Sequence, residues 1–178
     1  MARRNKSVEY LFVDGYNIIF AWKVLKKLAD SSLEDARKKL LEMLSDFQGF
    51  SGLEIVVVFD AHNVKDNVGS IEHYDNLTAV YTKEDETADN YIERCTYLLA
   101  RNYKVRVATS DNLEQVIIMG RGAIRISAME LYEEVMASKQ VQESDYIAKR
   151  PVKRNQLFDN LDEKLQGELM RLIRQEEK

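Results

Sequence analysis

The chain has 178 residues, of which 45% are apolar and 31% are charged, with one proline and one cysteine. A chain of this length can bury a core without cross-links, and one cysteine excludes both a disulfide framework and a cage of cysteines around zinc. No apolar run reaches the roughly 18–20 residues of a membrane span or has the form of a signal peptide, so we expect a soluble cytoplasmic protein. The net charge of −4 argues against a strongly basic nucleic-acid-binding coat but not against local basic patches.

The first third of the chain alternates predicted strands with predicted helices. Residues 8–14 are apolar, with β-branched and aromatic members, which is typical of a buried strand. Residues 54–60 form a Val/Ile run that indicates a central parallel strand, buried on both faces. Between these strands we predict a short helix over 17–28 and a longer helix that begins at a capping box of Ser31 and Glu34.

The same alternation continues to about residue 136. Residues 61–76 are polar without periodicity and predict a loop. Further strands are predicted over 78–82, 104–109 and 123–126, and helices over 86–101, after Asp111, and after a capping box of Ser127 and Glu130. Such alternation predicts right-handed crossovers and a three-layer α/β fold whose mainly parallel sheet has about five strands.

The pattern changes beyond residue 137, and we divide the chain into a domain over 1–140 and an extension over 141–178. The extension begins with a polar linker that carries a basic cluster of Lys149, Arg150, Lys153 and Arg154. Leucines at helical spacing then predict a C-terminal helix over 156–174.

Aspartates follow three of the predicted strands, at Asp14, Asp60 and Asp111. A fourth, Asp89, lies in the first turns of a predicted helix, beside its apolar stripe. The carboxyl ends of parallel strands form the ligand-binding edge of a sheet, and carboxylates gathered there require a cation, for which Mg²⁺ or Mn²⁺ is suited. Each aspartate taken alone is more simply explained as a loop starter or a helix cap than as a catalytic residue.

Other catalytic motifs are absent or weak. The chain has no phosphate-binding loop of the Gly-x-x-x-x-Gly-Lys-Ser/Thr type, no dinucleotide fingerprint after the first strand and no Gly-x-Ser-x-Gly elbow. His62 and His73 fall in the predicted loop, and Cys95 falls on an apolar helix face, where we expect it in the core. Metal-dependent phosphoryl chemistry is the remaining reaction class.

Four short motifs in this order resemble the NYN branch of the PIN-like nucleases, and most closely its YacP-like members. They are Val13-Asp14-Gly15-Tyr16-Asn17, Val58-Phe59-Asp60-Ala61-His62, Thr82 to Asp89, and Ala108-Thr109-Ser110-Asp111. The resemblance covers residues 8–136. It implies a PIN-like fold and a metal-dependent endoribonuclease that cleaves messenger RNA in association with the ribosome, without a small-molecule cofactor.

The resemblance also implies roles for individual residues. Asp14, Asp89 and Asp111 would bind Mg²⁺ (or Mn²⁺), and Asn17 and Asp60 would support them. Glu86 is a lower-ranked further acid, since it lies farther from the buried helix face.

Basic groups at the periphery would have to attract RNA to an acidic centre. The candidates are Arg121 and the cluster of Lys149, Arg150, Lys153 and Arg154. Tyr16 could stack on a base or simply pack in the domain. Three alternatives stay open: a catalytically inactive RNA- or ribosome-binding module, a receiver-like phosphoacceptor, and a magnesium enzyme acting on small phosphate esters.

Overall fold

The structure is a computed structural model that describes residues 8–60, 69–110 and 122–145. Its strands are β1 (Glu9–Asp14), β2 (Glu54–Phe59), β3 (Ser70–Tyr74), β4 (Leu77–Tyr81), β5 (Lys104–Ala108) and β6 (Ile124–Ile126). Its helices are α1 (Gly15–Ala21), α2 (Lys23–Ala29), α3 (Leu33–Ser51), α4 (Ala88–Leu99) and α6 (Ala128–Asp145).

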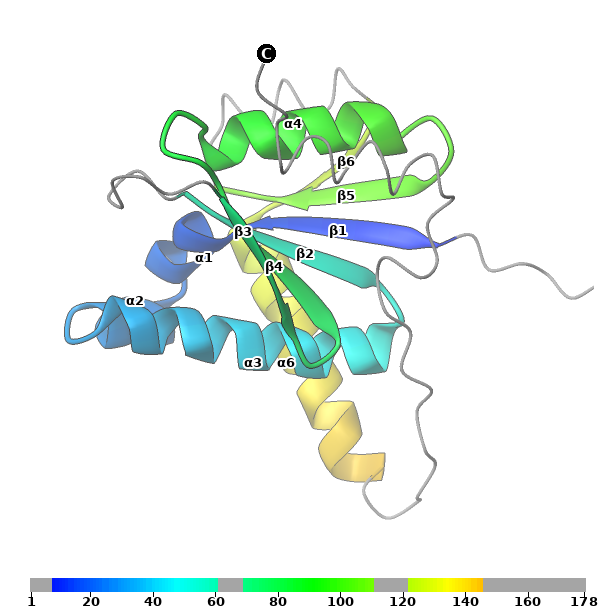
Figure 1. The fold of residues 1–178 in the computed structure, drawn as a ribbon. Helices are drawn as coiled ribbons and strands as arrows, with labels where there is room; N and C mark the ends of the chain where they lie inside the picture. Colours follow the sequence, from blue (N-terminus) through cyan, green and yellow to red (C-terminus); the bar gives the residue numbers. More distant parts are fainter. Residues whose placement is uncertain (1–7, 61–68, 111–121, 146–178) are drawn as a thin grey trace, which may run out of the picture.

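The strands form one six-stranded sheet in the order β3-β4-β2-β1-β5-β6, and all neighbours are parallel except β3 and β4 (Figure 1). The expected mainly parallel α/β fold is confirmed, with β2 inside the sheet as predicted. The expectation that residues 61–76 form only a loop is wrong, because β3 lies within them and makes a hairpin with β4. Asp75, at φ 49, supplies the left-handed turn of that hairpin.

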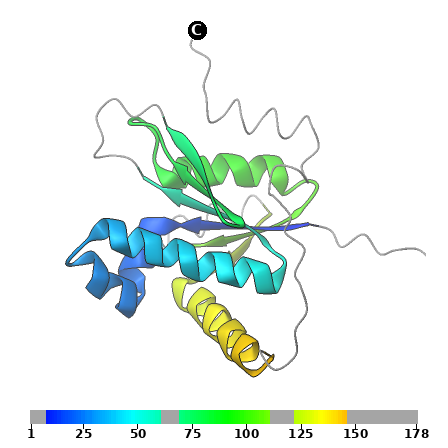
Figure 2. The same cartoon turned by 60° about the horizontal axis from the view of Figure 1, so that its bottom comes forward.

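Helices cover both faces of the sheet, so the three expected layers are present. Figure 2 shows α4 on one face and α3 with α6 on the other. Successive residues of β1 and β2 alternate between the two cores: Val13 and Val57 pack on the α3 side, and Phe12 and Val58 on the α4 side. This alternation explains why both strands are continuous apolar runs.

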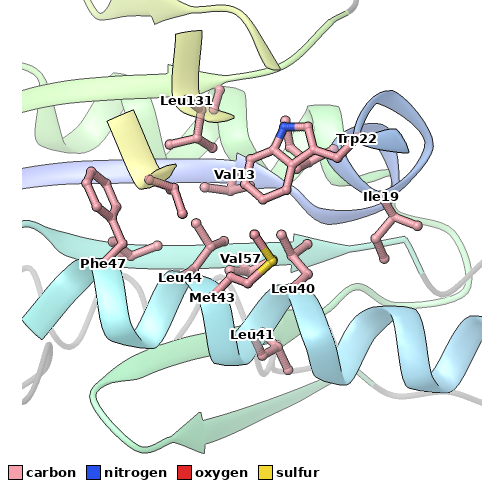
Figure 3. Close-up of a cluster of buried hydrophobic side chains, with 14 of the residues drawn as sticks. Val13, Ile19, Trp22, Leu40, Leu41, Met43, Leu44, Phe47, Val57 and Leu131 are labelled. Carbon is pink, nitrogen blue, oxygen red and sulfur yellow. The ribbon is translucent and has the colours of Figure 1, made fainter. Parts of the chain in front are cut away.

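A break at Trp22 divides the single helix that we predicted over 17–28 into α1 and α2. The Trp22 side chain is buried, and its indole N–H donates to the backbone oxygen of Ala128 at 2.7 Å. Figure 3 shows this ring within the cluster of buried side chains that also contains Val13 and Ile19. The break therefore follows from a tertiary contact with the start of α6.

The helix starts agree with the sequence to within a few residues. Ser127 and Glu130 form the expected capping box, each side chain accepting from the other's backbone N–H. For α3 the cap is Ser32, which accepts from Asp35, and the predicted box of Ser31 with Glu34 is wrong by one residue. Cys95 is in the core, as expected.

Several predictions lie outside the described residues: the helix after Asp111, the basic cluster over 149–154 and the helix over 156–174. The part of the chain that the structure describes contains no helix both long and apolar enough to cross a bilayer.

Candidate active site

The strand register brings the ends of β1, β2 and β5 together. Asp14, the last residue of β1, pairs with Val58 of β2, so that Asp60 follows two positions later. On its other side, Val13 pairs with Ala108, which places Thr109 level with Asp14. Asp111 itself lies outside the described residues. The register thus brings the strand-end aspartates Asp14 and Asp60 to one edge of the sheet, and the prediction for Asp111 stays a prediction.

Asp14 is buried, with 8% of its surface exposed, and it caps α1. Its Oδ1 accepts a hydrogen bond from the backbone N–H of Asn17 at 3.1 Å. The structural explanation, a carboxylate that caps a helix, therefore applies to Asp14. A helix cap and a catalytic role are compatible in one carboxylate, because its two oxygens can accept from or bind different partners.

Asn17 connects two strand ends. Its side-chain oxygen accepts a hydrogen bond from the backbone N–H of Ser110 at 2.7 Å. Asn17 thus contacts the cap of α1 through its backbone and the segment after β5 through its side chain. The contact fixes the backbone at Ser110, the residue before Asp111 in the sequence.

Asp60 and Asp89 belong to other elements than Asp14. Asp60 is half-buried directly after β2, whose last carbonyl, that of Phe59, accepts from Thr82 after β4 at 3.0 Å. Asp89 is exposed in the first turn of α4, a helix that Thr87 caps. Figure 1 shows α4 beginning over the edge at which β1 and β2 end. Glu86, the lower-ranked acid, forms an ion pair with Arg94 of α4, which gives it a structural role.

The acids seen at this edge supply only oxygen ligands, the type that Mg²⁺ and Mn²⁺ prefer. Within residues 8–60, 69–110 and 122–145, no three histidine, cysteine or acidic side chains lie close enough to hold a metal ion. A set of three would require Asp111. The carboxylate oxygens of these aspartates fit Mg²⁺ or Mn²⁺, and the third carboxylate would come from Asp111, which follows Ser110 in the sequence.

Beside these acids lies an aromatic cluster that consists of Tyr16, Phe59 and Tyr81. The Tyr16 ring meets Phe59 edge-on with centroids 5.3 Å apart, and Phe59 stacks on Tyr81 at 5.4 Å. We expected Tyr16 either to stack on an RNA base or to pack in the domain, and the structure shows that it packs. Burial raises the pKa of Tyr81, and the charge of Glu72 raises it further, while Arg37 lowers it.

Arg37 of α3 belongs to this neighbourhood and was absent from our list of candidate residues. Its Nη1 donates to the Tyr16 hydroxyl at 3.1 Å, and its guanidinium lies 6.0 Å from the centre of the Tyr81 ring. The sequence could have indicated Arg37, because it directly follows the buried Ala36 and so lies at the border of the buried face of α3. Arg121 and the cluster over 149–154 lie outside the described residues.

Three comparisons with known proteins agree with each other. The YacP-like NYN domain family matches residues 11–174. A Bacillus subtilis relative described as "Uncharacterized protein YacP" is 43% identical over 129 residues, which are 72% of this chain and 75% of the relative. Among solved structures, a crystal structure of Rae1 (YacP) from Bacillus subtilis superposes with a TM-score of 0.66 at 39% identity, over 78% of this chain and 79% of that one. A point mutant of the same protein covers 92% of this chain and 99% of its own, with a TM-score of 0.67 at 34% identity.

Proposed function

We propose that this chain, which belongs to the YacP-like NYN domain family, is a metal-dependent endoribonuclease that hydrolyses phosphodiester bonds of messenger RNA on the translating ribosome. The family and its relatives support the nuclease role. The structural observation that carries the proposal is the pairing of β1 with β2 and β5. This pairing puts the buried Asp14 between Asp60 and the segment that leads to Asp111.

In this proposal Asp14, Asp89 and Asp111 hold Mg²⁺ (or Mn²⁺), and Asn17 and Asp60 support them. The ion, when bound, supplies charge neutralisation at the scissile phosphate and an activated water. Asn17 keeps the ends of β1 and β5 at a fixed separation through its bond to Ser110. Asp14 is held in one orientation by the backbone N–H of Asn17, so its carboxylate needs little reorganisation to act as a ligand.

The acidic edge repels RNA, and the proposed function therefore needs basic groups around it. We assign this role to Arg121 and to the cluster of Lys149, Arg150, Lys153 and Arg154. The proposal places the protein in the cytoplasm, with RNA and the ribosome as partners and with neither a membrane nor a small-molecule cofactor.

Incubation of the purified chain with a translated messenger RNA, with and without ribosomes, in Mg²⁺ and in chelator, tests this proposal. We expect endonucleolytic products only with the divalent ion, and none from the Asp14→Asn variant. Binding of RNA or ribosomes without cleavage in any arm would favour an inactive binding module. Cleavage that persists in chelator would contradict the proposed metal dependence.

A further inference from the structure

The Arg37 side chain is held in place by neutral groups. It is half-buried on α3, one guanidinium N–H donates to the Tyr16 hydroxyl, and the Tyr81 ring lies beneath it. Tyr16 is fixed in turn by its edge contact with Phe59, which is fully buried. The guanidinium therefore has a defined position that the sheet and α1 impose.

No acidic side chain neutralises this cation in the part of the chain that the structure describes. The ion pairs there join Lys39 with Glu42, Glu86 with Arg94, and Arg106 with Glu9 and Glu134. Arg106, whose side chain is largely buried, is paired with the carboxylates of Glu9 and Glu134. Arg37 instead receives a phenol oxygen and an aromatic face, which hold a guanidinium while leaving its charge intact.

This arrangement leaves hydrogen-bond donors for a ligand. A guanidinium has five N–H donors, of which Tyr16 takes one, and the Tyr16 hydroxyl that accepts this bond still has its own proton to donate. A planar fork of N–H groups beside a phenol is complementary to the two non-bridging oxygens of a phosphodiester.

The Arg37 and Tyr16 donors lie near the strand ends that carry the acids. Tyr16 lies two residues after Asp14, and Phe59, the ring against which Tyr16 packs, directly precedes Asp60. The cluster therefore sits at the ends of β1, β2 and β4, on the side of the sheet that α3 covers. A phosphate bound by Arg37 would therefore lie on the α3 side of the strand ends that precede Asp60 and include Asp14.

Building on the proposed function, we propose that Arg37, held by Tyr16, is a positioning residue that binds a backbone phosphate of single-stranded RNA beside the cleavage site. Its positive charge would attract the RNA backbone and so offset the repulsion that the nearby acids exert on it. This role assigns Tyr16 to the orientation of Arg37 rather than to stacking on a base.

Binding of a short fluorescent single-stranded RNA, measured by anisotropy in chelator, tests the inference without any need for cleavage. The matched control is Lys38→Gln, since Lys38 is the next residue of α3 and is exposed. We expect Arg37→Gln to weaken binding about tenfold, the size of one charge-assisted hydrogen bond, with Lys38→Gln close to wild type. The slope of log affinity against log salt should fall by about 0.7 in Arg37→Gln, the value for one phosphate on a single strand.

The Tyr16→Phe variant, which keeps the ring and removes the hydroxyl, separates positioning from stacking. We expect it to weaken binding several-fold in the wild-type background and to have no further effect in Arg37→Gln. Equal losses in Arg37→Gln and Lys38→Gln, or an unchanged salt slope, would overturn the inference. Wild-type protein that cleaves RNA on ribosomes but shows no affinity for the free strand would also overturn it, while the proposed function would stand. Binding that depends on Arg37, without cleavage in any arm, would instead support the inference and contradict the nuclease.

Discussion

The side-chain oxygen of Asn17 accepts a hydrogen bond from the backbone N–H of Ser110 at 2.7 Å, although 93 positions separate the two residues. This contact joins the first turn of α1 to the segment that follows β5. The proposed mechanism uses Asp14, which caps α1, together with Asp111, which follows Ser110 in the sequence. Asn17 is thus placed to hold the segment after β5 against the end of β1 without being a ligand itself.

Replacement of Asn17 by alanine should damage activity more than stability. Ser110 is exposed, so its N–H can bind water when the asparagine oxygen is removed. The loss in unfolding free energy should be about 0.5–1.5 kcal/mol. Cleavage should fall at least tenfold, because the segment carrying Asp111 is no longer tied to α1. Urea unfolding and RNA cleavage, measured on the same preparation, check both values.

Asn17→Asp is the control, since it keeps an acceptor for Ser110 but adds a negative charge near Asp14. Repulsion between the two carboxylates should lower its stability in chelator, and Mg²⁺ should stabilise it more than it stabilises the wild type. An Asn17→Ala protein whose activity falls only in proportion to its folded fraction would show that the contact is merely structural.

Gly15 is required by the close approach of Phe59. A Cβ built on Gly15 would lie 2.3 Å from a carbon of the Phe59 ring, which is fully buried and cannot withdraw. Gly15→Ala should therefore destabilise the fold by about 1–3 kcal/mol through overpacking. The matched control is Gly49→Ala within α3, where the nearest atom would be 3.9 Å away, and alanine should stabilise the helix by about 0.5–1 kcal/mol. Thermal melts of the two variants should shift in opposite directions.

The sequence predicted those strands whose burial is continuous. β1 and β2 are buried on both faces, so their apolar runs were sufficient. β3 is an edge strand with exposed Glu72 and His73, and its residues carry no such run. Asp75-Asn76 was the signal that could have revealed it, because these residue types favour the left-handed turn of a hairpin.

For the site, the sequence predicted the residue types but not their contacts. The aspartates were found because strand ends in a parallel sheet share one edge, a rule that needs no coordinates. The bond from Ser110 to Asn17 and the bond from Arg37 to Tyr16 cross between elements whose relative placement comes only from packing. The break at Trp22 was missed for the same reason, since its cause is the backbone oxygen of Ala128.

The buried Gln48 side chain should be essential for attachment of the β3–β4 hairpin. Its amide nitrogen donates to the backbone oxygen of Asn76 at 2.6 Å, and its oxygen accepts from the N–H of Ile55 at 2.8 Å. Gln48→Met, similar in volume, leaves both backbone groups without a partner and should cost about 2–4 kcal/mol. Asn76→Ala is the control, because Asn76 contributes only its backbone oxygen to this bond. Denaturant midpoints of the two variants should differ clearly, and equal midpoints would contradict this assignment.

Cys95 should be unreactive in the folded protein. Burial raises the pKa of its thiol to about 12, from 9.0 for an accessible thiol. At pH 8 the thiolate population is thus lower by about a thousandfold, and a disulfide reagent should label the protein only on unfolding. The sign for stability follows from the same shift: between pH 9 and 12 only the unfolded chain loses this proton, so the thiol contribution to stability falls as pH rises. Rapid labelling of native protein at pH 8 would contradict the burial.

The acids make the most direct test of the proposed mechanism, because loss of a ligand should lower activity far more than it lowers stability. Asp14→Asn keeps a side-chain oxygen to accept from the N–H of Asn17, and asparagine caps helices as well as aspartate does. Removal of one negative charge from the acidic edge relieves repulsion. The melting temperature in chelator should therefore be unchanged or higher, whereas Mg²⁺ should stabilise the variant less than the wild type.

Asp89→Asn should behave in the same way for activity, with a small difference in stability. Asp89 is exposed in the first turn of α4, where its charge favours the helix by at most about 1 kcal/mol, so a slight loss is expected in chelator. Cleavage of RNA should fall by orders of magnitude in both variants, since each removes one ligand of the proposed ion. Melting with and without Mg²⁺, run beside the cleavage assay, separates this outcome from that of a purely structural acid, for which activity would fall only in proportion to the folded protein. Full cleavage by Asp89→Asn would remove Asp89 from the site and leave the proposed ion without its ligand from α4.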